Sequence, residues 1–131
     1  MLLYTLFGVP CVYYGDEIGM EGYSDPFCRR TFAWREINEK LLKFFQRLGK
    51  IRSKLAVFRE GVYSEKFADE NCIVYERRTK NQVVVVAINR GEKKYDICFE
   101  GKMYDLLNEA RIENKFVIEP QSYSILSNIL A

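Results

Sequence analysis

The fold is decided by the stretch Gln82-Val83-Val84-Val85-Val86-Ala87-Ile88-Asn89, whose central residues are all apolar. Most of them are β-branched, and such side chains favour extended backbone because they pack well on a pleated sheet. A short run that is apolar at successive positions is typical of a strand covered on both faces. The stretch therefore predicts the central strand of a β-sheet.

Outward from this stretch, short runs rich in Val, Ile, Tyr and Phe alternate with turn residues such as Asn, Asp, Gly and Pro, at a spacing typical of an all-β domain. The strand predicted at 94–99 alternates apolar and polar residues, so we expect it to be half exposed. We expect an antiparallel β-sandwich over residues 59–131. Its predicted strands are 61–67, 72–78, 82–89, 94–99, 102–107, 115–118 and 122–126.

Before the sandwich, the pattern predicts one amphipathic helix. Asn38 is a suitable N-cap, and apolar residues recur after it at helical spacing up to about Val57. Lys and Arg occupy the other face of this helix, which we expect to be solvated.

The amino-terminal part predicts a strand followed by a long loop. Residues 11–14 are bulky and apolar after a break at Gly8 and Pro10, which indicates a strand covered on both faces, as in the parallel sheet of an α/β protein. Residues 15–35 are rich in Gly, Asp, Pro and Arg and predict an ordered loop. Long loops at strand ends often carry function.

The composition excludes several functions. The sequence contains no histidine, which removes the commonest general base and metal ligand. Its four cysteines, at positions 11, 28, 72 and 98, form no CxxC pair, so we expect them to be reduced and mostly buried, with no metal or cofactor. A net charge of +2 from scattered basic residues predicts no nucleic-acid partner.

Residues 1–14 are apolar but lack a basic start, and they are too few to span a bilayer. We therefore expect no membrane partner and a cytoplasmic location.

Two consecutive runs carry a resemblance. Gly8-Val9-Pro10-Cys11-Val12-Tyr13-Tyr14-Gly15-Asp16-Glu17-Ile18-Gly19-Met20 resembles the segment at the eighth barrel strand of the α-amylase family of glycoside hydrolases. Asp25-Pro26-Phe27-Cys28-Arg29-Arg30-Thr31-Phe32-Ala33-Trp34 is similar to the branch of neopullulanases, cyclomaltodextrinases and maltogenic amylases, in which a DPxxRR-type stretch follows that strand. Cys28, before the double Arg, departs from the pattern of the branch.

The resemblance implies that residues 1–58 are the end of a (β/α)8 barrel, with strand 8, a long loop and helix 8, and that residues 59–131 are the family's carboxy-terminal β-sandwich. Family members are retaining enzymes, and their nucleophilic Asp, acid/base Glu, supporting Asp and histidines precede the segment present here. We therefore expect the carboxy-terminal portion of a hydrolase of α-glucans (starch, cyclodextrin or pullulan), with no catalytic residue and no activity alone.

The resemblance places Asp25 and Arg29 near the sugar subsites of the intact enzyme, where they would contact an α-glucan or maltooligosaccharide. A carboxylate and a guanidinium suit a ligand rich in hydroxyl groups. The alternative is a local ion pair between the two, which we expect in this chain alone. Trp34 and Tyr23 could stack on a sugar face, but a single Trp before an amphipathic helix is expected to be a packing anchor.

Tyr14, Gly15, Asp16 and Glu17 are expected to shape the rim of the barrel. Asp16 and Glu17 are sequence neighbours at a strand end and point in different directions, so they do not face one glycosidic bond together.

Two other functions stay open. The sandwich could bind α-glucan by itself, with Tyr63, Tyr75, Tyr95 and Tyr104 as a platform, although cross-strand packing of these rings is the simpler interpretation. It could also be a structural or subunit-interface domain. In either case, we expect the apolar barrel segment to dock on the sandwich or to form a homo-oligomer.

Overall fold

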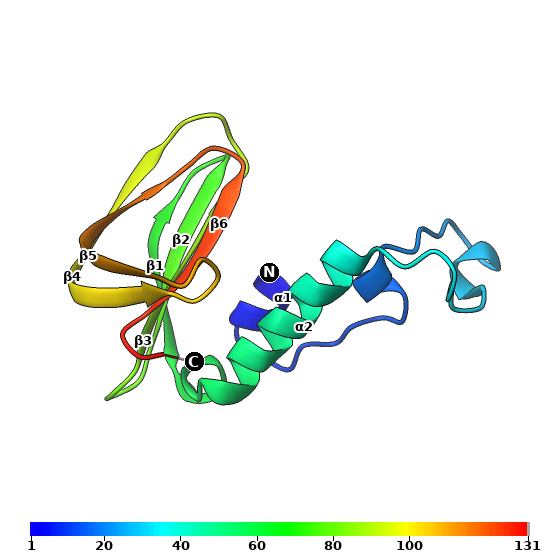
Figure 1. The fold of residues 1–131 in the computed structure, drawn as a ribbon, viewed down its shortest axis with the longest axis horizontal. Helices are drawn as coiled ribbons and strands as arrows, with labels where there is room; N and C mark the ends of the chain where they lie inside the picture. Colours follow the sequence, from blue (N-terminus) through cyan, green and yellow to red (C-terminus); the bar gives the residue numbers. More distant parts are fainter. Residues whose placement is uncertain (131) are drawn as a thin grey trace.

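The computed structural model describes residues 1–130 as a six-stranded sheet with three α-helices on one side (Figure 1). The mainly β class predicted from the sequence is confirmed. In chain order the elements are α1 (Leu2–Thr5), the 3₁₀ turns η1 (Asp16–Ile18) and η2 (Phe27–Arg29), α2 (Glu39–Lys54), α3 (Val57–Glu60), β1 (Val62–Ala68), β2 (Cys72–Arg78), β3 (Val83–Asn89), β4 (Tyr95–Asp105), β5 (Ala110–Ile118) and β6 (Ser122–Ser127).

All neighbouring strands pair antiparallel, in the order β1-β2-β3-β6-β4-β5. β3 lies between β2 and β6, which confirms the predicted central strand. β4 pairs with β6 only where Tyr104 and Asp105 face Ser127 and Leu126. Beyond this short pairing, β4 and β5 turn away from the other strands, so the sheet folds into two layers (Figure 1).

Two local predictions are wrong. Residues 11–14 form no strand, because residues 1–130 supply no neighbouring strand with which they could pair. The strands predicted at 94–99 and 102–107 are one strand, β4, whose register with β5 shifts between Cys98 and Lys102. Gly101, with φ of 80°, lies in this irregular part, so the predicted turn is a distortion within a strand.

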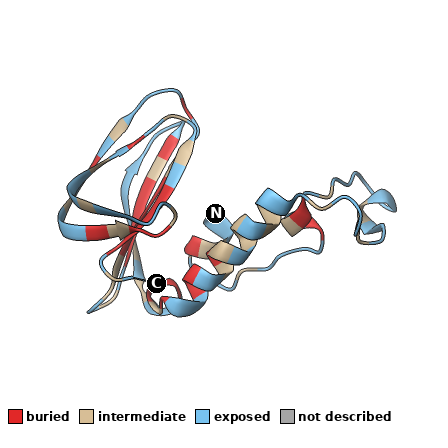
Figure 2. Ribbon diagram, viewed as in Figure 1, coloured by how far each residue is buried: buried red, intermediate tan, exposed pale blue. Residues whose placement is uncertain are grey.

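The sheet has an apolar core on each face, and β3 contributes to both. Because successive strand residues point to opposite faces, Val84 and Val86 pack toward α2 and α3, whereas Val85 and Ala87 pack between the two layers. Figure 2 shows these buried positions along the middle strands and on the sheet-facing side of α2. The core on the helix side joins Leu48, Ile51, Leu55, Val57 and Phe58 to Tyr75, Val84, Val86, Leu106 and Ile125.

The predicted helix is confirmed as α2. The Asn38 Oδ1 atom accepts a hydrogen bond from the Leu41 amide at 3.1 Å, which satisfies one of the unpaired donors of the first turn. α2 ends at Lys54, and the single turn of α3 begins at Val57. No helix among residues 1–130 is both long enough and apolar enough to cross a membrane.

Arg77 joins the amino terminus to the sheet. Its side chain is on β2, where the residue is 1% exposed. The guanidinium donates hydrogen bonds to the carbonyls of Thr5 at 3.1 Å, Phe58 at 3.3 Å and Gly61 at 2.8 Å. Burial lowers the pKa of Arg77. The guanidinium thus exchanges its hydrogen bonds to water for hydrogen bonds to carbonyls of three separate segments. Without Arg77, these carbonyls would be buried with no side-chain donor.

Tyr75, on the same face of β2, adds a second contact to the amino terminus. Its hydroxyl lies 2.6 Å from the Thr5 Oγ1 atom. Burial raises the pKa of Tyr75 to about 12, although the hydrogen bond to Thr5 acts in the opposite direction. Tyr75 is therefore a neutral hydrogen-bonding partner at any ordinary pH.

Arg52 of α2 makes a similar set of contacts with the chain that follows α1. It donates hydrogen bonds to the carbonyls of Tyr4 at 2.7 Å, Leu6 at 3.1 Å and Gly8 at 2.5 Å. Neither Arg52 nor Arg77 forms an ion pair within residues 1–130. The two arginines therefore act through backbone carbonyls, and residues 4–8 are held between α2 and the sheet.

Replacing Arg77 with Met should lower the free energy of unfolding by roughly 2–4 kcal/mol, because buried carbonyls lose their donors. Urea unfolding followed by circular dichroism measures this change. Arg35→Met, at an exposed position that forms no ion pair within residues 1–130, is the matched control and should change stability by less than about 0.5 kcal/mol. Equal effects of the two substitutions would show that the carbonyl contacts of Arg77 do not stabilise the fold.

Candidate functional site

The loop of residues 15–35 is anchored at its base by η1. Ile18 is 2% exposed, and its carbonyl accepts a hydrogen bond from the Asn38 amide at 3.3 Å. Gly15 and Gly19 flank η1 with φ of 96° and 79°, in the left-handed region that glycine adopts most easily. The loop therefore starts and ends beside the amino end of α2, and its middle part extends away from the rest of the molecule (Figure 1).

The structure brings the four predicted rim residues together at this base. The Tyr14 hydroxyl donates to the Arg30 carbonyl at 2.7 Å and ties the two sides of the loop together. The Gly15 amide donates to the Glu17 Oε2 atom at 2.9 Å. Asp16 is exposed. The Glu17 carboxylate is thus hydrogen-bonded within its own turn. Asp16 and Glu17 are not arranged as a pair that faces one glycosidic bond.

Asp25 and Arg29 form an exposed ion pair in the middle of the loop. The Arg29 Nε atom lies 2.8 Å from Asp25 Oδ1, and the Nη2 atom donates to Oδ2 at 3.1 Å. The Cys28 thiol also donates to Oδ1 at 3.0 Å, and this hydrogen bond raises the pKa of Cys28. The side chains of Asp25 and Arg29 are 62% and 72% exposed, so the pair organises the loop locally and contributes little to overall stability.

The aromatic side chains of the loop are uncovered. Trp34 is 76% exposed and its ring packs against Phe32, with the ring centres 4.6 Å apart. The prediction that Trp34 is a packing anchor is therefore wrong for this chain, because no core lies beside it within residues 1–130. Tyr23 is also exposed.

The cysteines are free, as predicted, but only Cys72 is buried, so the expectation of mostly buried thiols is wrong. Within the part of the chain that the structure describes, no three His, Cys, Asp or Glu side chains converge as ligands for a metal ion.

The four tyrosines considered as a platform do not share an exposed face. Tyr75 is buried, and Tyr63 packs on it with ring centres 5.3 Å apart. The Tyr104 ring lies beneath the Arg111 guanidinium, 5.4 Å from its centre. Tyr95 lies on another part of the sheet, in a groove that the sequence did not predict.

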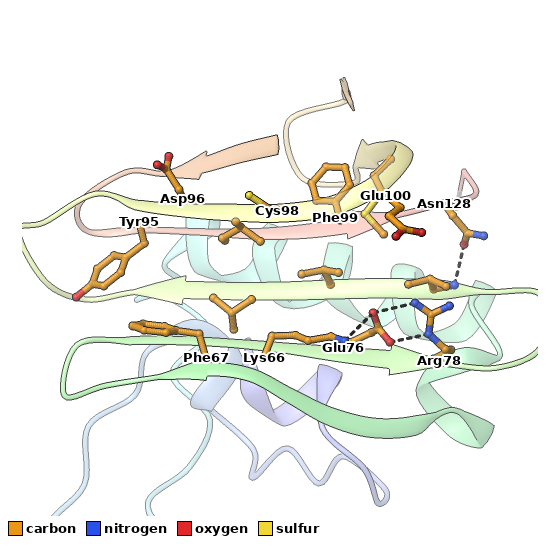
Figure 3. Close-up of a pocket in the computed structure, with 15 residues that line it drawn as sticks. Lys66, Phe67, Glu76, Arg78, Tyr95, Asp96, Cys98, Phe99, Glu100 and Asn128 are labelled. Atoms are coloured by element: carbon orange, nitrogen blue, oxygen red, sulfur yellow. Dashed lines mark hydrogen bonds and ion pairs between the residues drawn. The ribbon is translucent and has the colours of Figure 1, made fainter. Parts of the chain in front are cut away.

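This sheet groove lies between the two layers and has a volume of about 830 Å³ (Figure 3). Its apolar part is formed by Val74, Val85, Ile97 and Met103, all of which are nearly buried. Around them lie the aromatic rings of Phe67 and Tyr95 and the charged groups of Lys66, Glu76, Arg78, Asp96 and Glu100 (Figure 3).

Glu76 is the unusual residue of the sheet groove, because it is a carboxylate that is only 7% exposed. Its Oε1 atom accepts from Arg78 Nε at 2.6 Å, and its Oε2 atom accepts from Arg78 Nη2 at 3.0 Å and lies 3.5 Å from Lys66 Nζ. The hydrogen bonds from Arg78 lower the pKa of Glu76, against the effect of burial. The sequence held a signal for this network, since Val74, Glu76 and Arg78 alternate along one face of β2.

Glu76 should make stability depend on pH. Its pKa is lowered in the folded state, so its stabilising contribution is complete above the ordinary value of 4.5 and disappears as the pH falls through the lower folded value. The difference in unfolding free energy between wild type and Glu76→Gln should therefore be largest above about pH 5 and shrink toward pH 3. Urea unfolding at a series of pH values measures it.

Glu65→Gln is the matched control, because Glu65 is exposed on β1 and forms no ion pair within residues 1–130. A wild type and a Glu76→Gln variant whose stability difference is the same at pH 7 and pH 3 would rule out the charged role of Glu76.

Comparison with known proteins finds this chain similar to a segment of a cyclomaltodextrinase and of a neopullulanase. It is 33% identical over 103 residues to a cyclomaltodextrinase from Bacillus sp., covering 75% of this chain and 18% of the relative. It is 42% identical over 95 residues to neopullulanase 2 of Thermoactinomyces vulgaris, covering 69% of this chain and 16% of the relative. The chain thus spans about a fifth of the length of these curated relatives. No family model matches it.

The fold of this chain also resembles part of a larger enzyme of known structure. The crystal structure of an Anoxybacillus α-amylase superposes with a TM-score of 0.88 at 23% identity, covering 99% of this chain and 31% of the amylase chain. The fold of this chain is therefore shared with about a third of that amylase chain. By sequence and by fold together, the chain is similar over its length to one segment of α-amylase-family enzymes, and it matches less than a third of each of these relatives.

Proposed function

We propose that these 131 residues form the carboxy-terminal, non-catalytic portion of an α-amylase-family glycoside hydrolase that acts on α-glucans, and that the chain alone does not cleave them. In this proposal residues 1–58 complete a (β/α)8 barrel, and residues 59–131 are the β-domain that follows it. The observation that carries the proposal is the state of residues 7–14. Residues 11–14 have the composition of a strand covered on both faces, yet Tyr13 is 54% exposed, and Phe7 and Val9 just before them are 72% and 92% exposed.

The exposed apolar side chains of residues 7–14 support the proposal that other protein covers this segment in the intact enzyme. Val12, Tyr13 and Tyr14 are also exposed, and a contiguous apolar surface of this kind usually marks a contact with other protein. Residues 4–8 are already held by Arg52 and Arg77, so residues 9–14 leave the module in a defined direction. The remaining strands of a parallel barrel would supply the cover that these residues lack.

The arrangement of the carboxylates in the loop supports the proposal that the isolated chain does not hydrolyse glucans. Retaining hydrolysis needs two carboxyl groups about 5 Å apart across the scissile bond. Glu17 is engaged with the Gly15 amide and Asp25 is paired with Arg29. The sequence also contains no histidine to serve as an acid or base. In the proposed function, catalysis is performed by residues outside this chain.

Asp25 and Arg29 are proposed to contact the sugar in the intact enzyme. Both are exposed on a loop held at its base by η1 and by the Tyr14–Arg30 hydrogen bond. Their ion pair keeps the carboxylate and the guanidinium together, and the pair presents acceptors and donors to sugar hydroxyl groups. Tyr14, Gly15, Asp16 and Glu17 would then position the loop at the rim of the barrel.

The purified chain should not release reducing sugar from maltotetraose, β-cyclodextrin or pullulan at a rate above the blank. A reducing-end assay with overnight incubation measures this, with a commercial α-amylase as the positive control. Reproducible turnover that is lost in Asp16→Asn or Glu17→Gln would overturn the proposal, because it would place catalysis within these residues.

A second prediction concerns the exposed segment. We expect the isolated chain to self-associate through residues 7–14, and the triple substitution Phe7→Ser, Val9→Ser and Tyr13→Ser to shift it toward monomer by removing exposed apolar surface. Sedimentation velocity at several concentrations measures the change. Val62→Ser, which removes an apolar side chain that is 74% exposed on β1, is the matched control. A wild-type chain that stays monomeric throughout would contradict this role of the segment.

A further inference from the structure

We propose that the sheet groove is a second carbohydrate site, which binds a short, neutral stretch of α-glucan independently of the loop. The choice of an α-glucan rests on the proposed function, whereas the site itself rests on the geometry of the groove. The groove lies on the face of the sheet opposite to α2, away from Asp25 and Arg29 (Figures 1 and 3).

The size of the groove suits a short oligosaccharide. Its volume of about 830 Å³ lies within the range of about 300–1,000 Å³ found for small-molecule sites. It runs along β2 from Val74 to Arg78, which is about 13 Å at about 3.3 Å per residue. An apolar base with a few polar groups at its side is the usual composition of such sites.

One end of the groove is aromatic. Phe67 of β1 and Tyr95 of β4 lie with ring centres 5.4 Å apart, and Phe67 is 42% exposed. The Tyr95 hydroxyl donates to Asp69 Oδ2 at 2.8 Å, so the ring is held in place before any ligand arrives. A rigid aromatic surface is a suitable partner for the C–H face of a pyranose ring, because it buries apolar area at little cost in conformational entropy.

The other end of the groove is ionic, and some of its hydrogen-bond donors have no partner in the ion-pair network. Arg78 directs the N–H groups of Nε and Nη2 to Glu76, out of the five that a guanidinium carries. The remaining N–H groups, together with the Lys66 ammonium, can donate to sugar hydroxyl groups. Glu76 is buried and charged, so a hydroxyl that donates to it makes a charge-assisted hydrogen bond.

The charges of the groove favour a neutral ligand. Two cations, Lys66 and Arg78, line the groove with two carboxylates, Glu76 and Glu100, so the lining has almost no net charge. Asp96, at the border of the groove, is already paired with Lys115 at 3.1 Å. An anionic ligand such as a phosphate finds no excess of positive charge here. A hydroxyl-rich neutral ligand can use both donors and acceptors.

The strand edges at the groove do not favour an extended peptide. β1 is an edge strand whose pairing with β2 shifts between Glu65 and Phe67, with Lys66 in the irregular position. β4 has a similar shift between Cys98 and Lys102. Bulges and lysines on an edge oppose the addition of another strand. These observations select a small ligand in preference to a peptide.

The test is a titration of the isotope-labelled 131-residue chain with maltotriose, followed by amide proton–nitrogen NMR. We expect the largest shifts at Val74, Glu76, Tyr95 and Ile97. Shifts confined to residues 23–34 would overturn the groove site and leave the proposed function intact. An unchanged spectrum would overturn the groove site as well, and the turnover assay would still decide the proposed function separately.

Two substitutions test the two ends of the groove. Arg78→Gln removes charge-assisted donors and should weaken maltotriose binding about tenfold. Tyr95→Ala removes the aromatic surface and should weaken binding by a similar factor, about tenfold. Tyr123→Ala, which removes a tyrosine that is 46% exposed on β6 outside the groove, is the matched control and should bind as wild type does.

Thermal melting of each variant separates loss of binding from loss of folding. Arg78 has a side chain that is 57% exposed, so Arg78→Gln should remain folded even if Tyr95→Ala does not. Folded Arg78→Gln that binds maltotriose with wild-type affinity would overturn the ionic end of the site. Titration with cellotriose, in which the glucose units are β-linked, should produce smaller shifts in the groove. Shifts as large as those with maltotriose would overturn the assignment of the site to an α-glucan.

Discussion

The buried guanidinium of Arg77 is the interaction on which the arrangement of this chain depends. A cation withdrawn from water needs hydrogen-bonding partners, and Arg77 finds them in carbonyls of Thr5, Phe58 and Gly61. Those carbonyls belong to the amino-terminal segment, to α3 and to the residue between α3 and β1. One side chain therefore joins the segment that precedes the loop to the helix side of the sheet.

One consequence for function is that hydrogen bonds at both ends of the loop fix its position relative to the β-domain. Arg52 extends the same kind of contact to Gly8, while Asn38 joins the end of the loop to α2 and to η1. The loop that carries Asp25 and Arg29 is thus fixed at both ends by the module that the β-domain supports. In the proposed function, a domain that takes no part in the chemistry still sets the position of sugar-contacting residues.

β2 shows how one strand serves two surfaces. Its residues Tyr75 and Arg77 face the helices, whereas Glu76 and Arg78 face the sheet groove. Buried charged residues on both faces of an inner strand such as β2 are costly unless each is paired or hydrogen-bonded. Both conditions are met, since Arg77 donates to carbonyls and Glu76 accepts from Arg78. The same strand therefore stabilises the junction with the amino terminus and supplies the polar end of the groove.

The sequence by itself determined the mainly β class, the central strand β3, the helix α2 with its cap at Asn38, and the resemblance to the α-amylase family. These depend on local periodicity, capping chemistry and a contiguous motif. Only the tertiary structure decided that residues 11–14 form no strand, that Trp34 is exposed, and that Glu76, Arg78 and Tyr95 meet around one groove. The reason is physical: pairing, burial and convergence depend on neighbours distant in sequence, and the local pattern of residues does not say which neighbours are present.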